Sequence, residues 1–344
     1  MDKIQIINPI NYQNWDDLIA TNSQSTFFHT LGWSKVLCES YGYKPLYFCH
    51  IGDNTIIGLI AVAEINSRLT GKRGVSLPFS DYCPPIAINF DHFNYLFKRV
   101  REYGRKAGWN SIEIRGGKKY LKNIAPFSIF KTHNLNLGNE PEKILSLFRN
   151  STRRNIKKAK KVGVKITKSS SEEAIKEFYH LNCLTRKVHG IPPQPIKFFL
   201  NYYKHIILKK NGVVILASNS GNNIAGAVFS SNNAKAIYKY GASDLQYNDL
   251  RPNNIVMWSA IKHYIKRGFK TFSFGRTELS HSGLLQFKRG WGTYEETLKY
   301  YKYDLRKDCF VNDNIKLKSS YWIFKKMPIP ILKFVGKTLY KHIG

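Results

Sequence analysis

The sequence predicts two copies of one mixed α/β unit, followed by a basic amphipathic tail. The patterns of residues 102–115 and 263–276 each predict the end of a helix, a glycine and then a strand with alternating apolar residues. A polar, hairpin-like turn lies upstream of each, at residues 52–61 and 220–228. Both halves therefore predict strand, turn, strand, further strands, helix and strand. Chance similarity between two α+β halves is the alternative.

The chain of 344 residues is long for one hydrophobic core, so length also favours two domains. We expect an N-terminal domain over residues 1–147 and a C-terminal domain over residues 148–312. A tail then covers residues 313–344, and its last 29 positions from Lys316 contain no Asp or Glu. We expect the second domain to contain the functional site.

The charge composition is strongly basic. The 54 Lys and Arg residues exceed the 23 Asp and Glu residues, for a formal net charge of +31. Such a charge favours a polyanionic partner, which could be nucleic acid, anionic lipid or a phosphorylated substrate. A coding bias toward Lys, Asn and Ile is the alternative explanation for part of this excess.

The chain starts without the apolar core of a signal peptide, and no apolar run is long enough to cross a bilayer. We therefore expect a cytoplasmic protein. The five cysteines are far apart and include no Cys-x-x-Cys pair, which is typical of reduced thiols. The ten histidines lack the spacing of a metal-binding motif, so no metal site is expected.

A basic helix is predicted between the two copies. Asn150 or Ser151 is the expected N-cap, and Gly163 is the expected end. Four basic residues share one face at helical spacing: Arg153, Lys157, Lys160 and Lys161. This helix could be a solvated linker. It could also form a stripe that contacts phosphate groups, because Lys and Arg bind phosphate oxygens without reading a nucleotide sequence.

The tail combines lysines with apolar side chains. Lys333, Lys337 and Lys341 recur every four residues, which leaves a largely apolar opposite side. Trp322 and Tyr340 suit the headgroup level of a bilayer. Such a helix could pack on the protein, but we expect it to bind an anionic membrane surface, on the inner face of the cell membrane.

Lys288 lies in an apolar, glycine-flanked aromatic segment, residues 283–292, that follows the strand-like residues 271–276. A partly desolvated ammonium can neutralise the charge that develops on an acyl oxygen, so Lys288 is a candidate for stabilising acyl transfer. A solvated surface lysine is the alternative. Arg276, at the end of the preceding strand, is a candidate substrate-binding residue.

Six motifs in this order carry a family resemblance: residues 27–36, 77–82, 152–159, 185–192, 238–243 and 285–292. On these motifs the chain resembles the Fem-type (FemAB/FemX-like) branch of the GNAT acyltransferase superfamily, whose members carry two such folds in tandem. The resemblance implies transfer of an aminoacyl group from aminoacyl-tRNA to an amine of a nucleotide- or lipid-linked cell-envelope precursor. It implies no tightly bound cofactor.

The resemblance also implies residue roles. Lys35 and Arg186 match the positions that contact the diphosphate of the precursor, and Lys288 matches the lysine beside the reacting ester. Asp81, Tyr82 and Tyr240 are further candidates for orienting the amine. A turn cap and core aromatic rings are the alternative roles of these three.

Two departures from the family pattern bear on the donor. Residues 246–254 lack the glycines with which relatives that use acyl-CoA bind a pyrophosphate, so coenzyme A is put in doubt. Residues 171–210 contain two short helical patterns split by prolines, without a long helical arm. Without such an arm the surface that binds a tRNA is unexplained, although the basic helix could form part of it.

We therefore expect an aminoacyl or acyl transfer in envelope-precursor synthesis. The first alternative is an acyl-CoA-dependent N-acyltransferase that acts on an amino sugar of a surface polysaccharide. The second is a non-catalytic basic adaptor between membrane and nucleic acid. The joint presence of Lys35, Arg186 and Lys288 argues against the adaptor.

Overall fold

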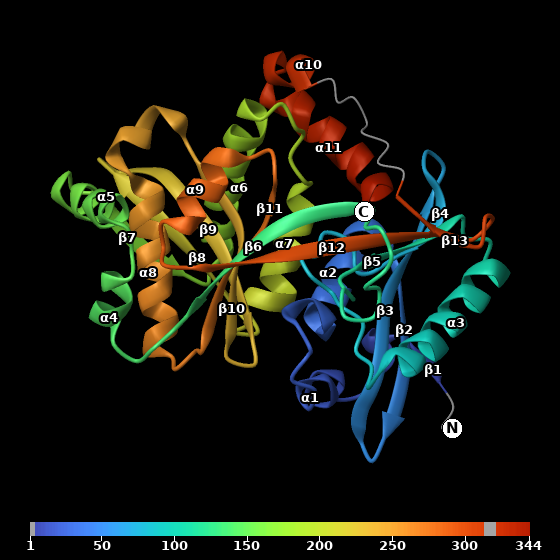
Figure 1. The fold of residues 1–344 in the computed structure, drawn as a ribbon. Helices are drawn as coiled ribbons and strands as arrows, with labels where there is room; N and C mark the ends of the chain where they lie inside the picture. Colours follow the sequence, from blue (N-terminus) through green and yellow to red (C-terminus); the bar gives the residue numbers. More distant parts are fainter. Residues whose placement is uncertain (1–3, 313–320) are drawn as a thin grey trace. The chain divides into compact units, whose positions relative to one another are not determined.

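The computed structural model describes residues 4–312 and 321–344. The chain forms two compact units (Figure 1), each treated by itself below. The described parts of unit one are residues 4–130, 297–312 and 339–344, and those of unit two are residues 131–296 and 321–338. Each unit is thus assembled from segments that are not contiguous in sequence. The assignment of repeated domains with boundaries at residues 147 and 312 stays a prediction.

Unit one contains the first group of helices and strands. Its helices are η1 (Pro9–Asn11), α1 (Trp15–Ala20), η2 (Phe27–His29), α2 (Leu31–Tyr41) and α3 (Phe90–Lys106). Its strands are β1 (Gln5–Ile7), β2 (Lys44–Gly52), β3 (Thr55–Ser67), β4 (Gly71–Val75), β5 (Ser111–Arg115) and β13 (Cys309–Val311), with β12 (Tyr294–Asp304) from Thr297 onward.

The sheet of unit one runs in the order β1-β2-β3-β4-β5-β12, and β13 pairs with β12. The pairs from β1 to β4 are antiparallel, whereas β4 and β5 are parallel, with Gly74 opposite Ile112. A parallel pair needs a crossover, and α3 supplies it. Gly108, at φ +71, ends this crossover helix in the left-handed conformation.

Helices cover both faces of this sheet because its strands are apolar on both sides. Phe93 and Phe97 of α3 pack on Phe48 of β2 and Ile112 of β5. On the opposite face Trp15 of α1 meets the ring of Tyr47 at 5.2 Å, and the Tyr47 hydroxyl hydrogen-bonds Ser34 of α2 at 2.8 Å. Alternate residues of β2 therefore point into two layers of core.

Unit two contains the remaining elements. Its helices are α4 (Pro141–Ser146), α5 (Asn150–Lys161), α6 (Glu172–Val188), α7 (Ile196–Tyr202), η3 (Tyr203–Ile207), η4 (Leu245–Leu250), α8 (Pro252–Lys266), α9 (Ser282–Arg289) and α10 (Tyr321–Lys326), with α11 (Ile329–Ile343) up to Thr338. Its strands are β7 (Lys165–Ser169), β8 (Gly212–Asn219), β9 (Asn222–Asn232), β10 (Lys235–Ser243) and β11 (Thr271–Glu278), with β6 (Ser128–Asn136) from Lys131 onward.

The predicted repeat is confirmed by the strand order. In unit two β7 to β10 are antiparallel neighbours, and β10 pairs in parallel with β11 after the crossover helix α8, as β4 pairs with β5 after α3. Gly268, at φ +74, follows α8 as Gly108 follows α3. Both predicted turns are two-residue turns with positive φ, at Asp53–Asn54 and at Ser220–Gly221. The mixed α/β fold class predicted from these signals is correct.

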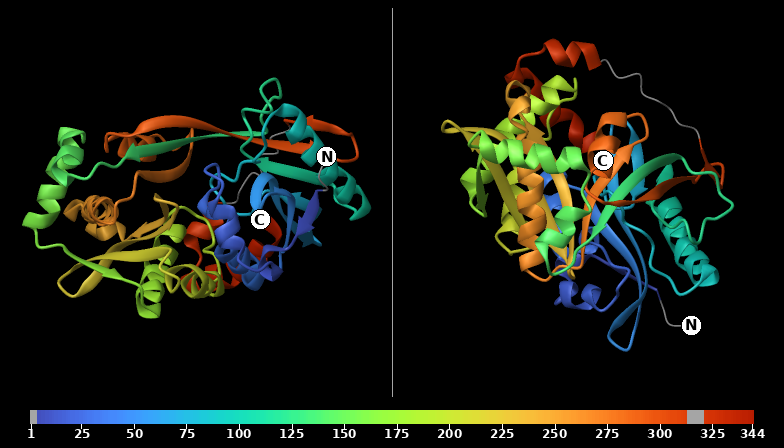
Figure 2. Two further views of the ribbon diagram at one scale, coloured as in Figure 1. Left: turned by 90° about the horizontal axis from the view of Figure 1, so that it is seen from below. Right: turned by 60° about the vertical axis from the view of Figure 1, so that its left-hand side comes forward.

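Helices cover both faces of the sheet of unit two (Figure 2). Tyr264 and Ile261 of α8 pack with Phe229 of β9 and Phe272 of β11. On the other face α6 contacts β8, β9 and β10, and Phe178 lies at Gly226, where a Cβ atom would meet it at 3.4 Å. Strand β10 therefore lies between α6 and α8.

Two local expectations need correction, and a third is confirmed. Helix α5 begins at Asn150, so its N-cap is Arg149 rather than Asn150 or Ser151. Helix α6 is not a short helical pattern but has 17 residues, because Ser171 caps it and apolar residues recur along it before the prolines. The glycine-free loop does lead into a helix at Pro252, as expected.

The tail helices α10 and α11 pack partly on the protein. Leu332 is fully buried, and Gly336 lies so close to the Pro193 carbonyl oxygen that a Cβ atom would stand 1.9 Å from it. Other apolar side chains are exposed, namely Trp322 at 65% and Phe334 at 67%. Among the described residues, no helix combines the length and the apolar character that a membrane span requires. Contact of the exposed side with a bilayer stays a prediction.

Candidate active site

Lys288 lies in the last turn of α9 in unit two and is only 2% exposed. Its Nζ donates hydrogen bonds to the carbonyl oxygens of Gly275 at 3.0 Å and of Arg276 at 3.2 Å. Both acceptors belong to β11, where Gly275 has φ +67. A buried ammonium is therefore fixed by two backbone carbonyls on the strand that runs parallel to β10.

The glycines after Lys288 allow the chain to turn tightly. A Cβ atom on Gly290 would stand 2.6 Å from Thr152 Oγ1. Gly292 has φ +66, and a Cβ atom there would stand 2.9 Å from the Leu147 carbonyl oxygen. Trp291 between them is fully buried. These contacts explain the glycine-flanked aromatic pattern and hold the end of α9 in place.

A charged cluster follows directly after α9. The Glu295 carboxylate accepts hydrogen bonds from Arg289 Nε and Nη2, at 2.9 and 2.7 Å, and lies 3.0 Å from Lys131 Nζ. Partial burial acts to raise the pKa of Glu295, but the bonds from Arg289 and Lys131 outweigh it and lower this pKa to about 2. Glu295 is therefore ionised at neutral pH, and it ties β6 to the end of α9.

His133 of β6 completes this cluster. It is fully buried, and its Nε2 lies 3.1 Å from Glu295 Oε2. Burial lowers the pKa of His133, and the positive charge of Lys288 lowers it further, against the opposing effect of Glu295. The His133 imidazole is therefore neutral at neutral pH and is influenced by both Lys288 and Glu295.

Sequence reasoning missed His133, Glu295 and Lys131. His133 and Glu295 are 162 positions apart, so no local pattern joins them. The available signal was Glu295 itself, which is one of few acids in a basic chain and follows the Lys288 segment closely.

The other predicted residues of unit two lie on three elements. Arg276, half-buried on β11, contributes the carbonyl that Lys288 binds. Tyr240 of β10 follows a bulge and packs against Phe199 at 5.5 Å between ring centroids. Arg186 is half-buried in the last turn of α6, and its charge contributes to the lowered pKa of His189, which burial mainly causes. Arg276 and Lys288 are thus joined directly by a hydrogen bond.

The predicted residues of unit one are Lys35, Asp81 and Tyr82. Lys35 is half-buried on α2, and its charge opposes the rise that burial causes in the pKa of Asp16. Asp81 and Tyr82 lie in the loop after β4, where the Asp81 carbonyl accepts a 2.6 Å hydrogen bond from the Tyr300 hydroxyl. Tyr82 is 38% exposed. Their roles in binding substrate stay predictions.

The described residues contain no group of His, Cys, Asp or Glu side chains suited to hold a metal ion. Four of the five cysteines are buried or half-buried, and all five are free thiols. Burial raises the pKa of Cys183, which makes this thiol a poor nucleophile. The catalytic role of Lys288 stays a prediction.

Residues 146–289 match the family model described as acetyltransferase (GNAT) domain. The crystal structure of FemX superposes on 89% of this chain and 98% of its own length, with a TM-score of 0.69 and 16% sequence identity. Residues 146–289 thus resemble a GNAT domain, and the chain has the fold of FemX. The predicted tandem fold is confirmed, since a tandem GNAT protein of the clavulanic acid pathway also matches 88% of this chain with a TM-score of 0.52 and 8% identity.

Curated relatives match this chain over a shorter segment. The lipid II:glycine glycyltransferase of Staphylococcus haemolyticus is 37% identical over 81 residues, which are 22% of this chain and 19% of the relative. The enzyme of that name from Staphylococcus aureus is 34% identical over 77 residues, 21% of this chain and 18% of the relative. The match thus spans about a fifth of the length of each relative.

Proposed function

We propose that the chain is an acyltransferase that moves an aminoacyl group from aminoacyl-tRNA to an amine of a lipid-linked cell-envelope precursor. The observation that carries the proposal is the buried Lys288 ammonium, fixed at β11 within the segment that matches the GNAT domain. The similarity to lipid II:glycine glycyltransferases supports a lipid-linked peptidoglycan precursor as acceptor.

The proposed reaction is a direct displacement. The acceptor amine attacks the carbonyl carbon of the aminoacyl ester, and the carbonyl electron pair moves onto oxygen. Lys288 stabilises this oxyanion. When the intermediate collapses, the ester bond breaks, the ribose oxygen leaves, and the proton lost by the amine passes to that oxygen. An amide and a free tRNA end result, with no acyl-enzyme intermediate and no tightly bound cofactor.

The direct test offers the purified full chain a lipid-linked acceptor together with either aminoacyl-tRNA or acetyl-CoA. We expect mass spectrometry to detect an aminoacylated acceptor in the first reaction and no acetylated acceptor in the second. Acetylation alone would favour the amino-sugar N-acyltransferase, and a lack of product with any acceptor would favour the basic adaptor. The acyl-CoA alternative draws on the family description and on the tandem GNAT neighbour.

Acetyl-CoA is expected to bind weakly. The loop before α8 forms the short helix η4 and reaches Pro252 through Arg251 at φ +59, without a glycine. Side chains there hinder the close approach of backbone amides to a diphosphate. Calorimetry should give a dissociation constant in the high micromolar range or above, which corresponds to a free energy of binding of about −5 kcal/mol or weaker. A sub-micromolar constant would reverse the order of the two donors.

Lys35→Ala and Arg186→Ala are expected to raise the Michaelis constant of the acceptor. Both cations are proposed to bind its diphosphate in the ground state and in the transition state, so turnover should change little. Each loss should correspond to about 1.5–3 kcal/mol, typical of a charge-assisted hydrogen bond. Lys187→Ala, next to Arg186, is the matched control. A fall in turnover at constant Michaelis constant would contradict the binding role.

The exposed side of the tail is proposed to bind an anionic membrane surface. Trp322→Glu combined with Phe334→Glu should lower partitioning onto anionic vesicles by about 10-fold or more, because both side chains are exposed and apolar. Leu245→Glu with Leu279→Glu is the control, since these leucines are also about half exposed. Co-sedimentation measures the effect. Equal partitioning of both variants would refute a membrane role for the tail.

A further inference from the structure

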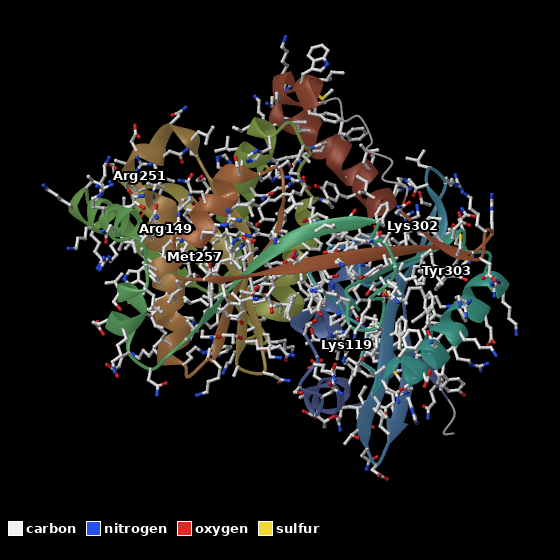
Figure 3. All side chains as sticks on the ribbon, viewed as in Figure 1. Lys119, Arg149, Arg251, Met257, Lys302 and Tyr303 are labelled. Atoms are coloured by element: carbon white, nitrogen blue, oxygen red, sulfur yellow. The ribbon has the colours of Figure 1, made fainter. Side chains whose placement is uncertain are left out.

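A basic surface forms on α5, β7 and α8 of unit two, which lie together in Figure 1. We call it the basic face and define it by six exposed residues: Lys157, Lys160, Lys161, Lys168, Lys262 and Arg267. The sequence predicted only the part on α5. Arg149 and Arg251, labelled in Figure 3, stand immediately before α5 and α8.

The cations of this face are close enough to repel one another. Burial lowers the pKa of Lys262, and the charges of Lys160 and Lys168 lower it further, while Glu142 opposes them. Burial and the charges of Arg267 and Lys168 likewise lower the pKa of the neighbouring His263. Three separate elements thus contribute to one field of positive potential.

The sequence supplies almost no acid to this face. Residues 143–171, which include α5 and β7, contain no Asp or Glu, and neither do residues 250–277, which include α8. Glu142, at the start of α4, is the acid that acts on Lys262. Uncompensated like charges destabilise a folded state, so such a face favours a polyanionic partner that removes the repulsion.

The partner that fits is a hydrated phosphate backbone rather than a bilayer. The apolar side of α5, formed by Thr152, Ile156 and Ala159, is buried, so this helix has no apolar side to insert between lipids. The aromatic rings beside the face are covered by its own cations, since Arg267 lies 5.3 Å from the ring centroid of Phe269 and Lys262 lies 5.6 Å from that of Trp258, so they offer no open platform on which an unpaired base could stack. Charge without stacking or insertion is typical of backbone contacts to a nucleic-acid duplex.

We propose that the basic face binds the phosphate backbone of an RNA duplex, independently of sequence. This inference rests on the proposed function, in which a tRNA carries the donor group. The face would then hold the duplex part of that tRNA through α5, β7 and α8. The binding energy would come mainly from the release of counterions, so the affinity must fall steeply with salt.

The test measures binding of uncharged tRNA to the full chain by fluorescence anisotropy at several salt concentrations. The variant combines Lys160→Glu, Lys168→Glu and Lys262→Glu. We expect its affinity to fall by at least about 30-fold at 0.1 M salt, and its logarithmic salt slope to fall by about 3. A control carries the same charge change on exposed lysines of unit one: Lys98→Glu, Lys106→Glu and Lys122→Glu.

Several outcomes decide the inference. Loss of tRNA binding in the first variant, with retained binding in the control, supports it. Equal affinities, or a first variant that loses only vesicle binding, overturn it. The thermal midpoint should not fall in the first variant, because the substitutions relieve repulsion. If the midpoint does fall, the tRNA affinity of a variant with Gln at the same three positions decides the inference.

The proposed function can fail separately. Lys288→Met, which leaves the basic face intact, should bind uncharged tRNA as tightly as the parent chain. If the parent chain binds tRNA through the face yet transfers no aminoacyl group, the inference stands and the proposed function fails. If aminoacyl transfer occurs but the triple variant has unchanged tRNA affinity, the inference fails alone.

Discussion

Lys288→Met should lower turnover by about 10²-fold or more, equivalent to about 3 kcal/mol, while the affinity for the acceptor stays nearly unchanged. The oxyanion exists only along the reaction path, so an ammonium that stabilises it contributes to the transition state and little to the ground state. Steady-state kinetics of aminoacyl transfer, with the acceptor concentration varied, separate turnover from the Michaelis constant.

The control for this variant is Lys270→Met, which removes an exposed lysine just before β11. The thermal midpoint of both variants should also be measured, because Met at position 288 leaves the carbonyls of Gly275 and Arg276 without their bond to Nζ. Full turnover in Lys288→Met would contradict the proposal that Lys288 stabilises the oxyanion. Equal losses of affinity at Lys35, Arg186 and Lys288 would make Lys288 a binding residue.

The repeated fold was predictable because its signals are local. A glycine two residues beyond each crossover helix takes a left-handed conformation, and each predicted hairpin turn contains two residues with positive φ. Strands β5 and β11 alternate apolar residues, and Ile112, Ile114, Phe272 and Phe274 are all buried. These features depend on a few neighbouring residues, so one sequence suffices to recognise them.

The surroundings of Lys288 were not predictable in the same way. The pattern of residues 283–292 indicated an unusual lysine but not the helix α9, and nothing local linked it to His133 and Glu295. Those contacts form between segments that are distant in sequence, and no local signal such as a turn or a helix cap predicts which distant segments meet. The length of α6 was also underestimated, since the prolines after it were read as breaking a shorter pattern.

A second large effect concerns acid stability and involves His29 in unit one. This imidazole is fully buried, its Nδ1 accepts a hydrogen bond from the Thr26 N–H at 3.0 Å, and its Nε2 lies 3.3 Å from Cys83 Sγ. Burial lowers the pKa of His29 to about 4, although hydrogen bonds at Pro84 and Thr26 act in the opposite direction. The folded state therefore disfavours the protonated ring.

The sign of the pH dependence follows from this lowered pKa. Above pH 6.5 the ring is neutral in both the folded and the unfolded chain, so His29 costs nothing there. As the pH falls from 6.5 toward 4, the unfolded chain binds the proton more readily, and the free energy of unfolding decreases. The expected loss is about 2 kcal/mol at pH 5 and about 3 kcal/mol well below pH 4.

Urea unfolding at pH 7.5 and pH 5 measures this loss, and His29→Gln should reduce the difference between the two pH values by about 2 kcal/mol. His180→Gln, at an exposed position of α6, should leave that difference unchanged. Comparing differences rather than absolute stabilities removes the cost of repacking Gln beside Cys83. If His29→Gln and the parent chain lose equal stability between pH 7.5 and pH 5, then His29 is protonated in the folded state and its burial does not control the acid sensitivity.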